Sequence, residues 1–374
     1  MSTKPTPHRV LGPLRAKHAA LIGGVALTLL AVALTTLIAA LGSCASKEAI
    51  RVGEPLKRRG DEIVVAGRYF HTGAPVVLWT DPGGYDAYRT EYRFEPFENR
   101  RYDAKAKPLL GPQRYNLREA GLTDEELELV RGGGWPLDLL REQIDQFVLH
   151  YDVCGVSQRC FRVLHDVRGL SVHFMLDIDG TIYQTLDVKE RAWHAGNANT
   201  RSIGIEIANI GAYPPDTESP LEQWYGKDED GEAIITLPSW VGDGGIRTPG
   251  FVGSPARPDP IRGRIHGETY EMYDLTPEQY DSLIKLTAAL CTIFPKLECD
   301  YPRDADGELI TTTLPEDAYE SFSGIVGHFH LTEGKIDPGP ALQWDRLVHE
   351  ARAIMRGSRR VEPFRRDFAR VEAD

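Results

Sequence analysis

The sequence is poor in basic side chains and in cysteine, and it contains no internal repeat or low-complexity run. Its 374 residues carry 43 Lys and Arg against 55 Asp and Glu, a formal net charge of −12. Nucleic-acid binding depends on clustered Lys and Arg that neutralise phosphates. The acidic balance therefore predicts that nucleic acid is not a partner. The length allows one large domain with extensions.

Long hydrophobic runs are also scarce, and the one that matters lies at residues 19–41, after four basic residues. A basic head, an apolar middle and small residues before a cut are typical of a secretory leader. The run is also long enough to span a bilayer. The following Leu41-Gly42-Ser43-Cys44 resembles the lipobox of bacterial lipoproteins, in which Cys44 would be lipidated. An uncleaved membrane helix and ordinary cleavage are the alternatives, and all three place the body of the chain outside the cytoplasm.

Only five cysteines are present. Outside the reducing cytosol, close pairs are expected to form disulfides. Cys154 and Cys160 would close a short loop, which stabilises by roughly 2–3 kcal/mol in the chain-entropy model. Cys291 and Cys299 are the second expected pair, although four cysteines allow three pairings. A cysteine zinc site is not expected, because the C-x2–4-C spacing is absent.

The chain is expected to have five parts. They are a leader or anchor at 1–43, a tether at 44–60, an N-terminal extension of unknown role at 61–140, a main domain at 141–357 and a C-terminal tail at 358–374. Within the main domain, residues 211–272 are rich in Pro, Gly and acidic residues and are too long for an ordinary connection. We interpret them as an insertion at the sheet edge.

Hydrophobic patterns predict strands interleaved with helices. Strands are expected at 146–150, 172–176, 181–184, 202–208 and 324–327, with a hairpin turn at Asp179-Gly180. Helices are expected at 124–130, at 155–167, from the cap at Thr276 to about 293, and at 342–355. Residues 62–80 have an extended pattern. The order favours an α/β or α+β protein with helices packed on a central sheet.

A candidate metal site lies near the C-terminal end. An imidazole at 328 and a carboxylate at 337 can close around one divalent cation, and His150, at the end of an apolar strand, offers a third ligand. Two histidines and one aspartate leave a tetrahedral zinc with an open position, as in catalytic sites. Taken singly, His150, His328 and Asp337 also fit ordinary boundary or turn positions. From the residues alone, His330 competes with His328.

Two further side chains could serve such a metal. Glu206 alternates with isoleucines on its strand, so it faces either solvent or a site, and the small Gly204 leaves space on the same side. A carboxylate near a metal-bound water is the usual general base of zinc hydrolases. Lys335 is either a surface charge or a group that stabilises an oxyanion.

The loop at 192–197 offers candidate substrate contacts in Trp193, His194 and Asn197. An imidazole beside an aromatic ring among small residues suits substrate binding. For His194, a hydrogen bond within the loop is an equal alternative. His173 is expected to pack against the sheet.

Five phrases together resemble the zinc-dependent N-acetylmuramoyl-L-alanine amidases of the type 2 family, which includes bacterial wall amidases, phage lysozyme-amidases and peptidoglycan-recognition proteins. They span about residues 144–355, in the family's order, and leave out the first 140 residues and the 211–272 insertion. The phrases are Val148-Leu149-His150, Ser171-Val172-His173-Phe174 with Asp179-Gly180-Thr181-Ile182-Tyr183-Gln184, Ala192-Trp193-His194-Ala195-Gly196, Ser202-Ile203-Gly204-Ile205-Glu206, and Val326-Gly327-His328 with Lys335-x-Asp337-Pro338-Gly339.

The resemblance implies a fold and a set of roles. The fold is a central mixed β-sheet flanked by helices, and residues 141–357 become a zinc amidase domain. His150, His328 and Asp337 are implied as ligands of Zn²⁺, which selects His328 over its neighbour at 330. Glu206 falls on the catalytic glutamate and Lys335 on the catalytic lysine. The Cys154–Cys160 pair also resembles the disulfide of recognition proteins.

Two features depart from the family pattern. Val172 stands where some members have a tyrosine, so Glu206 must supply the base alone. The loop between His328 and Asp337 varies in length among members.

The expected activity is hydrolysis of the amide between N-acetylmuramic acid and L-alanine. The expected partners are peptidoglycan or muropeptides, and a membrane reached through the Cys44 lipid or an N-terminal helix. The expected location is the cell envelope of a bacterium, facing the periplasm. A non-catalytic peptidoglycan-binding module and a zinc peptidase acting elsewhere on the stem peptide are the alternatives.

Overall fold

The structure is a computed structural model that describes Met1 and residues 52–88, 114–132, 134–357 and 361. The chain divides into two units, Met1–Lys57 and Arg58–Asp374. The described residues of the first unit form no helix or strand. Apart from Met1, the predicted leader lies outside the described residues, as do Cys44 and most of the predicted tail. Within the described ranges, no helix has the length and apolar character needed to cross a membrane.

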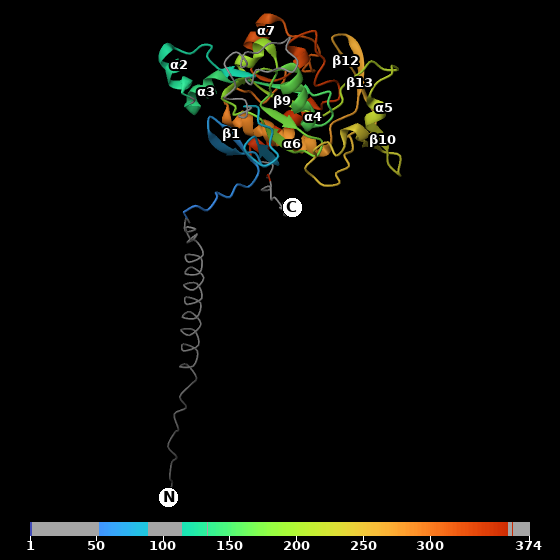
Figure 1. Cartoon of the computed structure of the whole chain (residues 1–374), viewed down its shortest axis with the longest axis horizontal. Helices are drawn as coiled ribbons and strands as arrows, with labels where there is room; N and C mark the ends of the chain where they lie inside the picture. The colour runs from blue at the N-terminus through green and yellow to red at the C-terminus, as the bar shows by residue number, and fades with distance from the viewer. Residues whose placement is uncertain (2–51, 89–113, 133, 358–360, 362–374) are drawn as a thin grey trace. The chain divides into compact units, whose positions relative to one another are not determined.

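A six-stranded sheet forms the centre of the second unit (Figure 1). In spatial order its strands are β14 (Gly324–Gly327), β5 (Gln146–Tyr151), β9 (Ser202–Ile207), β6 (Phe174–Leu176), β7 (Ile182–Gln184) and β3 (Val76–Leu78). The first four strands are parallel to one another, β7 runs antiparallel to β6, and β3 is parallel to β7. The prediction of a central mixed sheet flanked by helices is confirmed.

The two faces of this sheet bury different layers, because successive side chains of a strand point to opposite sides. On one face, Phe147 and Ile205 pack with helices α6 (Pro277–Ile293) and α8 (Trp344–Met355) in the main core. On the other face, Val148 packs with Ala195 and Ala198 of the loop after β8 (Glu190–Ala192). The second face therefore also carries the side chain of His150, two residues beyond Val148.

Helix α6 begins where its sequence predicts. The hydroxyl of Thr276 accepts a hydrogen bond from the backbone N–H of Gln279 at 3.0 Å, and the Gln279 side chain accepts one from the Thr276 N–H at 3.0 Å. This reciprocal pair satisfies two N–H groups that the first turn leaves free, and Pro277 occupies the first helical position. The predicted end near residue 293 is also found.

The other predicted elements occur with shifted bounds. The expected helix at 155–167 is α4 (Ser157–Arg162) followed by a π-helical turn, η3 (Val163–Arg168). The extended stretch at 62–80 is the hairpin β1 (Glu62–Val65) and β2 (Arg68–His71) followed by β3. The helix expected at 124–130 is α2 (Asp124–Arg131). Elements without a sequence prediction are α3 (Leu137–Gln143), α7 (Glu316–Ser321), β4 (Tyr115–Leu117), β8, η4 (Gly196–Thr200) and η6 (His328–His330).

The 211–272 insertion has structure of its own. It contains α5 (Leu221–Trp224), η5 (Ser239–Val241) and two hairpins, β10 (Tyr225–Lys227) with β11 (Ala233–Ile235) and β12 (Ile261–Ile265) with β13 (Glu268–Met272). None of these strands extends the central sheet. Met272 instead packs with Tyr151 at the end of β5 and with Ala341. The insertion was expected at the edge of the sheet. In the structure it instead packs over the end of the central strand β5.

The stretch at 61–140 contributes directly to the same fold. Strand β3 pairs with β7 at the edge of the central sheet, and the β1 residues Ile63 and Val65 belong to the main core. The predicted domain boundary at residue 140 stays a prediction.

All four described cysteines are free thiols, so the predicted disulfides are absent from the structure. Each predicted partner is nevertheless a neighbour, because the side chains of Cys154 and Cys160 contact one another, as do those of Cys291 and Cys299. Burial raises the pKa of Cys160, and the contact with Cys154 raises it further. The correction therefore concerns the bonds and leaves the neighbours as predicted.

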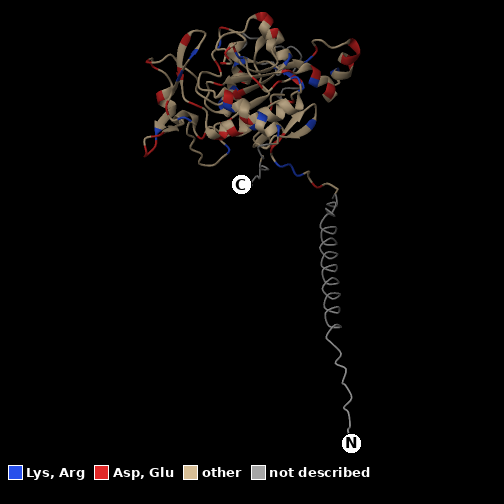
Figure 2. Cartoon of the chain, turned by 180° about the vertical axis from the view of Figure 1, so that it is seen from behind, with Lys and Arg blue, Asp and Glu red and all other residues tan. Residues whose placement is uncertain are grey.

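Positions of Asp and Glu, red on the ribbon of Figure 2, occur on outer helices of the second unit. The first turn of α2 holds Asp124, Glu125 and Glu126, and that of α7 holds Glu316 and Asp317. Acids near a helix N-terminus are favourable because they complement the helix dipole. Part of the acidic excess thus stabilises individual helices.

Candidate metal centre

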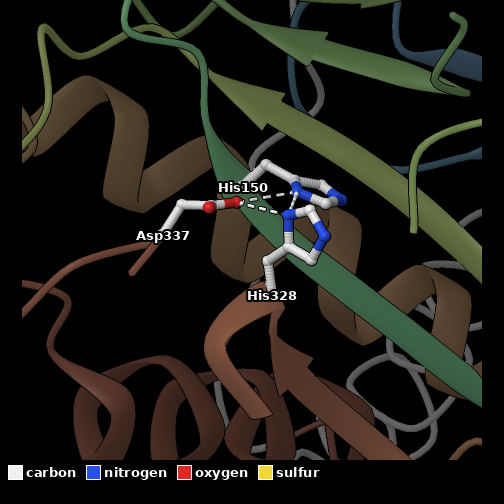
Figure 3. A group of neighbouring side chains, drawn as sticks. All are labelled: His150, His328 and Asp337. Atoms are coloured by element: carbon white, nitrogen blue, oxygen red, sulfur yellow. Dashed lines mark hydrogen bonds and ion pairs between the residues drawn. The ribbon is translucent and has the colours of Figure 1, made fainter. Parts of the chain in front are cut away.

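Three side chains from separate segments meet at one end of the parallel strands (Figure 3). His150 comes from β5, His328 follows β14, and Asp337 comes from the loop beyond η6. Strands β14 and β5 are parallel neighbours, so their carboxyl ends reach the same edge of the sheet. The topology thereby brings together residues nearly 190 positions apart in the sequence.

The ligand atoms of these residues form a small triangle. The distances are 2.8 Å from His150 Nδ1 to Asp337 Oδ2, 3.0 Å from His328 Nδ1 to Asp337 Oδ2, and 3.0 Å between the two Nδ1 atoms. Ligands of a tetrahedral zinc with bonds of about 2.0–2.1 Å lie roughly 3.3 Å apart. Two imidazole nitrogens and one carboxylate oxygen at nearly this spacing fit a zinc ion.

The protonation of the triangle also suits a cation. Burial, reinforced by the neighbouring His328, lowers the pKa of His150 to about 4. Burial acts to raise the pKa of Asp337, but the hydrogen bonds from both histidines outweigh it and leave that pKa below its ordinary value. A neutral imidazole and an ionised carboxylate are the forms that bind metal.

Glu206 lies beside this triangle on the adjacent strand. The register of β5 and β9 places it directly opposite His150, on the same face of the sheet. Burial raises the pKa of Glu206 well above its ordinary value, and the charges of Asp337 and Asp152 add to the effect. A carboxylate with a raised pKa next to a metal position can accept a proton and release it again.

Lys335 supplies the positive charge near the site. Its side chain is exposed, and its charge is near enough to lower the pKa of both His150 and Glu206. Its backbone is held by two hydrogen bonds, from its own N–H to Thr332 O and from His266 Nε2 to its carbonyl oxygen. In the described part of the chain the ammonium group makes no ion pair, so it can meet a charge that develops on a substrate.

His330 has a structural role. It is fully buried, its Nδ1 accepts a hydrogen bond from the Gly327 N–H at 2.8 Å, and its Nε2 donates to Ile310 O at 2.7 Å. Both ring nitrogens are therefore used. The structure brings His328, and not His330, to His150 and Asp337.

His194 contacts His150, one of the three residues of the triangle. Its Nδ1 lies 3.0 Å from His150 Nε2, and its Nε2 lies 3.4 Å from Ser202 Oγ. With the His150 Nδ1 left for the metal, His150 Nε2–H donates to His194 and His194 Nε2–H donates to Ser202. Such a contact fixes the tautomer and orientation of a metal-binding imidazole.

The other two predicted substrate contacts, Asn197 and Trp193, lie in different surroundings. Asn197 lines a cavity of about 650 Å³ that also borders His328 and Tyr319. The indole N–H of Trp193 instead donates to Asn116 Oδ1. Of the three predicted residues, Asn197 is thus the one placed on the cavity wall.

Sequence reasoning missed the groups that shape the His194 loop. The fully buried Arg118 donates to the carbonyl oxygens of Asn199, Thr200 and Ser202 at 2.8–3.0 Å. The Asn199 side chain accepts hydrogen bonds from the backbone N–H groups of His194 and Ala195. A single arginine in an unpatterned segment gives no sequence signal, because its partners are backbone atoms far along the chain.

Gly204 is required by the packing of His194. A Cβ atom at this position would lie 2.6 Å from both Cε1 and Nδ1 of the His194 ring. We expect Gly204→Ala to displace that ring from His150 and to weaken zinc binding by about 10- to 100-fold, as loss of a supporting contact does. Zinc affinity measured by competition with a chelator tests this. Gly132→Ala is the control, because no atom lies within 4 Å of its added methyl, and equal affinities in both variants would contradict the prediction.

His173 predicts a pH dependence of stability. It is fully buried, its Nδ1 accepts from the Gly204 N–H, and its Nε2 donates to Glu190 O. Burial, with the charge of Arg118, lowers its pKa to about 3, against about 6.5 in the unfolded chain. Between these two pKa values the unfolded state binds more protons than the folded state. The contribution of neutral His173 to the free energy of unfolding is therefore fully present above about pH 6.5 and is lost as the pH falls towards 3.

The measurement is urea unfolding of the metal-free chain at several pH values between 4.5 and 7. We expect His173→Asn to flatten the dependence by up to about 1.4 kcal/mol per pH unit, the limit for one proton. An unchanged slope would mean that His173 does not titrate as inferred.

Part of the chain is similar to known proteins. Residues 140–226 match the model of a family described as N-acetylmuramoyl-L-alanine amidase. The matched region contains His150, His194 and Glu206, while His328 and Asp337 lie beyond it. No curated protein matches the chain.

Several solved structures are similar to the chain. A selenomethionine derivative of AmpD has 18% identity and a TM-score of 0.29, with 63% of this chain and 89% of that one covered. AmiD from E. coli, in complex with the substrate anhydro-N-acetylmuramic acid-L-Ala-D-γ-Glu-L-Lys, has 17% identity and a TM-score of 0.31, with 58% of each chain covered. The endolysin amidase LysCS from Clostridium intestinale URNW has 14% identity and a TM-score of 0.30, with 57% and 86% covered.

Proposed function

We propose that this chain, which carries an N-acetylmuramoyl-L-alanine amidase domain of the type 2 family, hydrolyses the amide joining the lactyl group of N-acetylmuramic acid to L-alanine in peptidoglycan. The observation that carries the proposal is the meeting of His150, His328 and Asp337 within 3.0 Å, with Glu206 opposite His150 on the next strand. The reaction splits one C–N bond by addition of water.

The chain's own residues divide the work. Zinc held by the triangle would supply a Lewis acid that polarises the scissile carbonyl and lowers the pKa of water towards about 7. Glu206 accepts a proton as water attacks the carbonyl carbon. It then passes that proton to the amide nitrogen as the C–N bond breaks, so that L-alanine leaves as a neutral amine. The raised pKa of Glu206 suits both halves of this transfer.

Lys335 is placed to stabilise the negative charge that develops on the carbonyl oxygen. One well-placed donor of this kind contributes on the order of 3 kcal/mol to the barrier. The cavity beside His328, bordered by Asn197 and Tyr319, has room for part of the peptide or sugar.

Mass spectrometry of digested wall fragments tests the reaction. A defined probe is an anhydro-muropeptide of the composition printed for the AmiD complex. An amidase yields free sugar and an intact peptide that begins with L-alanine, a stem-peptide hydrolase yields a shortened peptide, and a binding module yields no product. Removing the metal with a chelator should abolish the products, and adding zinc should restore them. Products that persist after chelation would overturn the zinc requirement.

We propose further that the enzyme faces the periplasm and is anchored by a lipid on Cys44. Support comes from the sequence alone, in the basic head, the apolar run at 19–41 and the Leu-Gly-Ser-Cys ending. A Cys44→Ala chain should lose its lipid and keep an uncleaved leader. Two results would favour a plain transmembrane helix. One is that the Cys44→Ala chain and the natural chain have the same mobility on a gel, and the other is that the natural chain takes up no label when cells are fed a labelled fatty acid.

We also propose that the cysteine pairs oxidise in that compartment. Contact within the pair Cys154 and Cys160 and within the pair Cys291 and Cys299 supports this, because the partners already lie side by side. Thiol counting on the protein from the periplasm, before and after reduction, distinguishes two, one or no disulfides.

A further inference from the structure

The cavity beside the metal triangle has a volume of about 650 Å³ and is walled by three segments. They are the loop at 195–198, helix α7 with Leu314 before it, and the segment at 328–332. The volume lies within the range of about 300–1,000 Å³ that is typical of sites for small ligands. Because His328 forms part of the wall, a substrate whose amide lies at the triangle can extend into this cavity.

The cavity has an apolar floor. Four of its lining residues belong to, or pack against, one small hydrophobic cluster that includes Val148 of the central sheet: Ala195, Ala198, Tyr319 and Leu331. Apolar atoms gain free energy by leaving water for such a surface. The floor therefore suits the methylene groups of a ligand.

Two carboxylates stand at the edge of the same cavity. Glu316 and Glu320 both line it and both are exposed, so they lie where the cavity meets solvent. They are four residues apart on α7, which places them on one face of the helix. Among the described residues that line the cavity, none is Lys or Arg. The edge is thus acidic, and no lining side chain neutralises it.

The stability of α7 does not account for this pair. Like charges four residues apart repel each other and destabilise a helix. Glu316, in the first turn, complements the helix dipole, whereas Glu320, in the last turn, opposes it. In the described part of the chain neither carboxylate makes an ion pair, and Arg201 pairs with Asp145 instead. The two charges are therefore available to a ligand.

Contacts on both sides hold α7 in place. At its end, Arg201 donates to the carbonyl oxygens of Glu320 and Phe322 at 2.9 and 3.1 Å. Before its start, the Leu314 N–H donates to His330 O at 2.8 Å, in the turn that also carries His328. The backbone that carries the two carboxylates is thereby fastened to the segment of a candidate metal ligand.

We propose that this cavity selects muropeptides whose peptide carries a side-chain ammonium group, with Glu316 and Glu320 as the specificity-determining residues. An apolar floor with an acidic edge matches an alkyl chain that ends in a cation, because such a chain lays its methylenes on apolar surface and keeps its charge near water. The proposal rests on the amide hydrolysis proposed above and adds to it a preference for a diamino residue in the peptide.

The test compares two probes on the full-length chain, purified in detergent and loaded with zinc. The first is the muropeptide with the peptide L-Ala-D-γ-Glu-L-Lys, in which the lysine ammonium is the single cation, since the amine of L-alanine is part of the amide to be cut. The second is the same molecule with that lysine acetylated on its side chain, which removes the charge. We expect kcat/KM to be about five- to tenfold higher for the lysine probe, as two partly exposed ion pairs allow, and the difference to shrink in high salt.

Replacing both glutamates, as Glu316→Gln with Glu320→Gln, should remove this preference. We expect kcat/KM for the lysine probe to fall to the value of the acetylated probe, mainly through a higher KM, because the lost interaction binds ground state and transition state alike. Asp317→Asn is the matched control, since Asp317 is exposed on the same helix but does not line the cavity. It should keep the full preference.

Equal kcat/KM values for the two probes in the natural chain, or a preference that persists in the double variant, would overturn the proposal. If the natural chain released no product from either probe, amide hydrolysis would fail, and isothermal titration of both probes would then decide the preference. Tighter binding of the lysine probe that is lost in the double variant would uphold the role of the cavity, whereas equal binding or none would reject it. Zinc content measured on every sample separates these outcomes from failure of the metal triangle.

Discussion

Replacing Glu206 by glutamine should lower turnover by about 10³-fold and leave zinc bound, because an amide cannot take and return a proton. The side chain keeps its shape and its place opposite His150, so the change isolates the proton transfer. The binding of substrate should change little, since the zinc and the cavity beside His328 remain. The measurements are kcat and KM on a muropeptide together with zinc content.

The control for this change is Glu268→Gln. Glu268 is also a strand carboxylate, on β13, but it is exposed and lies in a hairpin outside the central sheet. It should keep full activity. A Glu206→Gln enzyme that retains its zinc and turns over like the control would mean that another group, or hydroxide from solution, takes the proton.

How far the sequence predicts this site depends on the type of signal each residue leaves. Glu206 could be placed on a face from alternation alone, since the isoleucines on either side fix which way it points. The structure places His194 over Gly204, in the space that a small residue on that face was expected to leave. Period-2 patterns report one face of a strand well because the geometry repeats every second residue.

Residues that act through backbone contacts leave no comparable signal. Arg118 binds three carbonyl oxygens more than 80 positions away, and no spacing rule in the sequence marks such a partner. His194 fitted substrate contact and a local hydrogen bond equally well. Its actual contact, with His150 from another strand, depends on the order of strands in the sheet. Sequence periodicity determines faces, and the topology then decides which faces meet.

The same reasoning explains the bonds that were expected and not found. Spacing suggested that Cys154 would lie near Cys160, and the two are neighbours. Whether neighbours are bonded depends on the surrounding redox potential and on the fraction of thiolate, which a chain sequence does not encode. Proximity and covalent bonding are therefore separate predictions.

The second large effect is expected from replacing His328 or His330. These two histidines lie close together in the sequence, but the first is a candidate zinc ligand and the second stabilises the fold. His328→Gln should weaken zinc binding well beyond the 10- to 100-fold that loss of a supporting contact costs, since it removes a ligand outright. Activity should fall to background, while the metal-free chain should unfold at nearly the same urea concentration as the natural metal-free chain. Among the described residues, the hydrogen bonds of the His328 ring are those to His150 and Asp337, so few other contacts are lost.

His330→Gln should give the reverse pattern. The buried ring at 330 satisfies Gly327 N–H and Ile310 O, and an imperfect replacement should cost about 1–3 kcal/mol of stability. Its zinc affinity should stay within a few-fold of the natural chain, because none of its atoms belongs to the triangle. Zinc titration and urea unfolding on both variants form the test. If both lost zinc equally, the metal would be held by the whole η6 turn, and the assignment of a single ligand to that turn would be wrong.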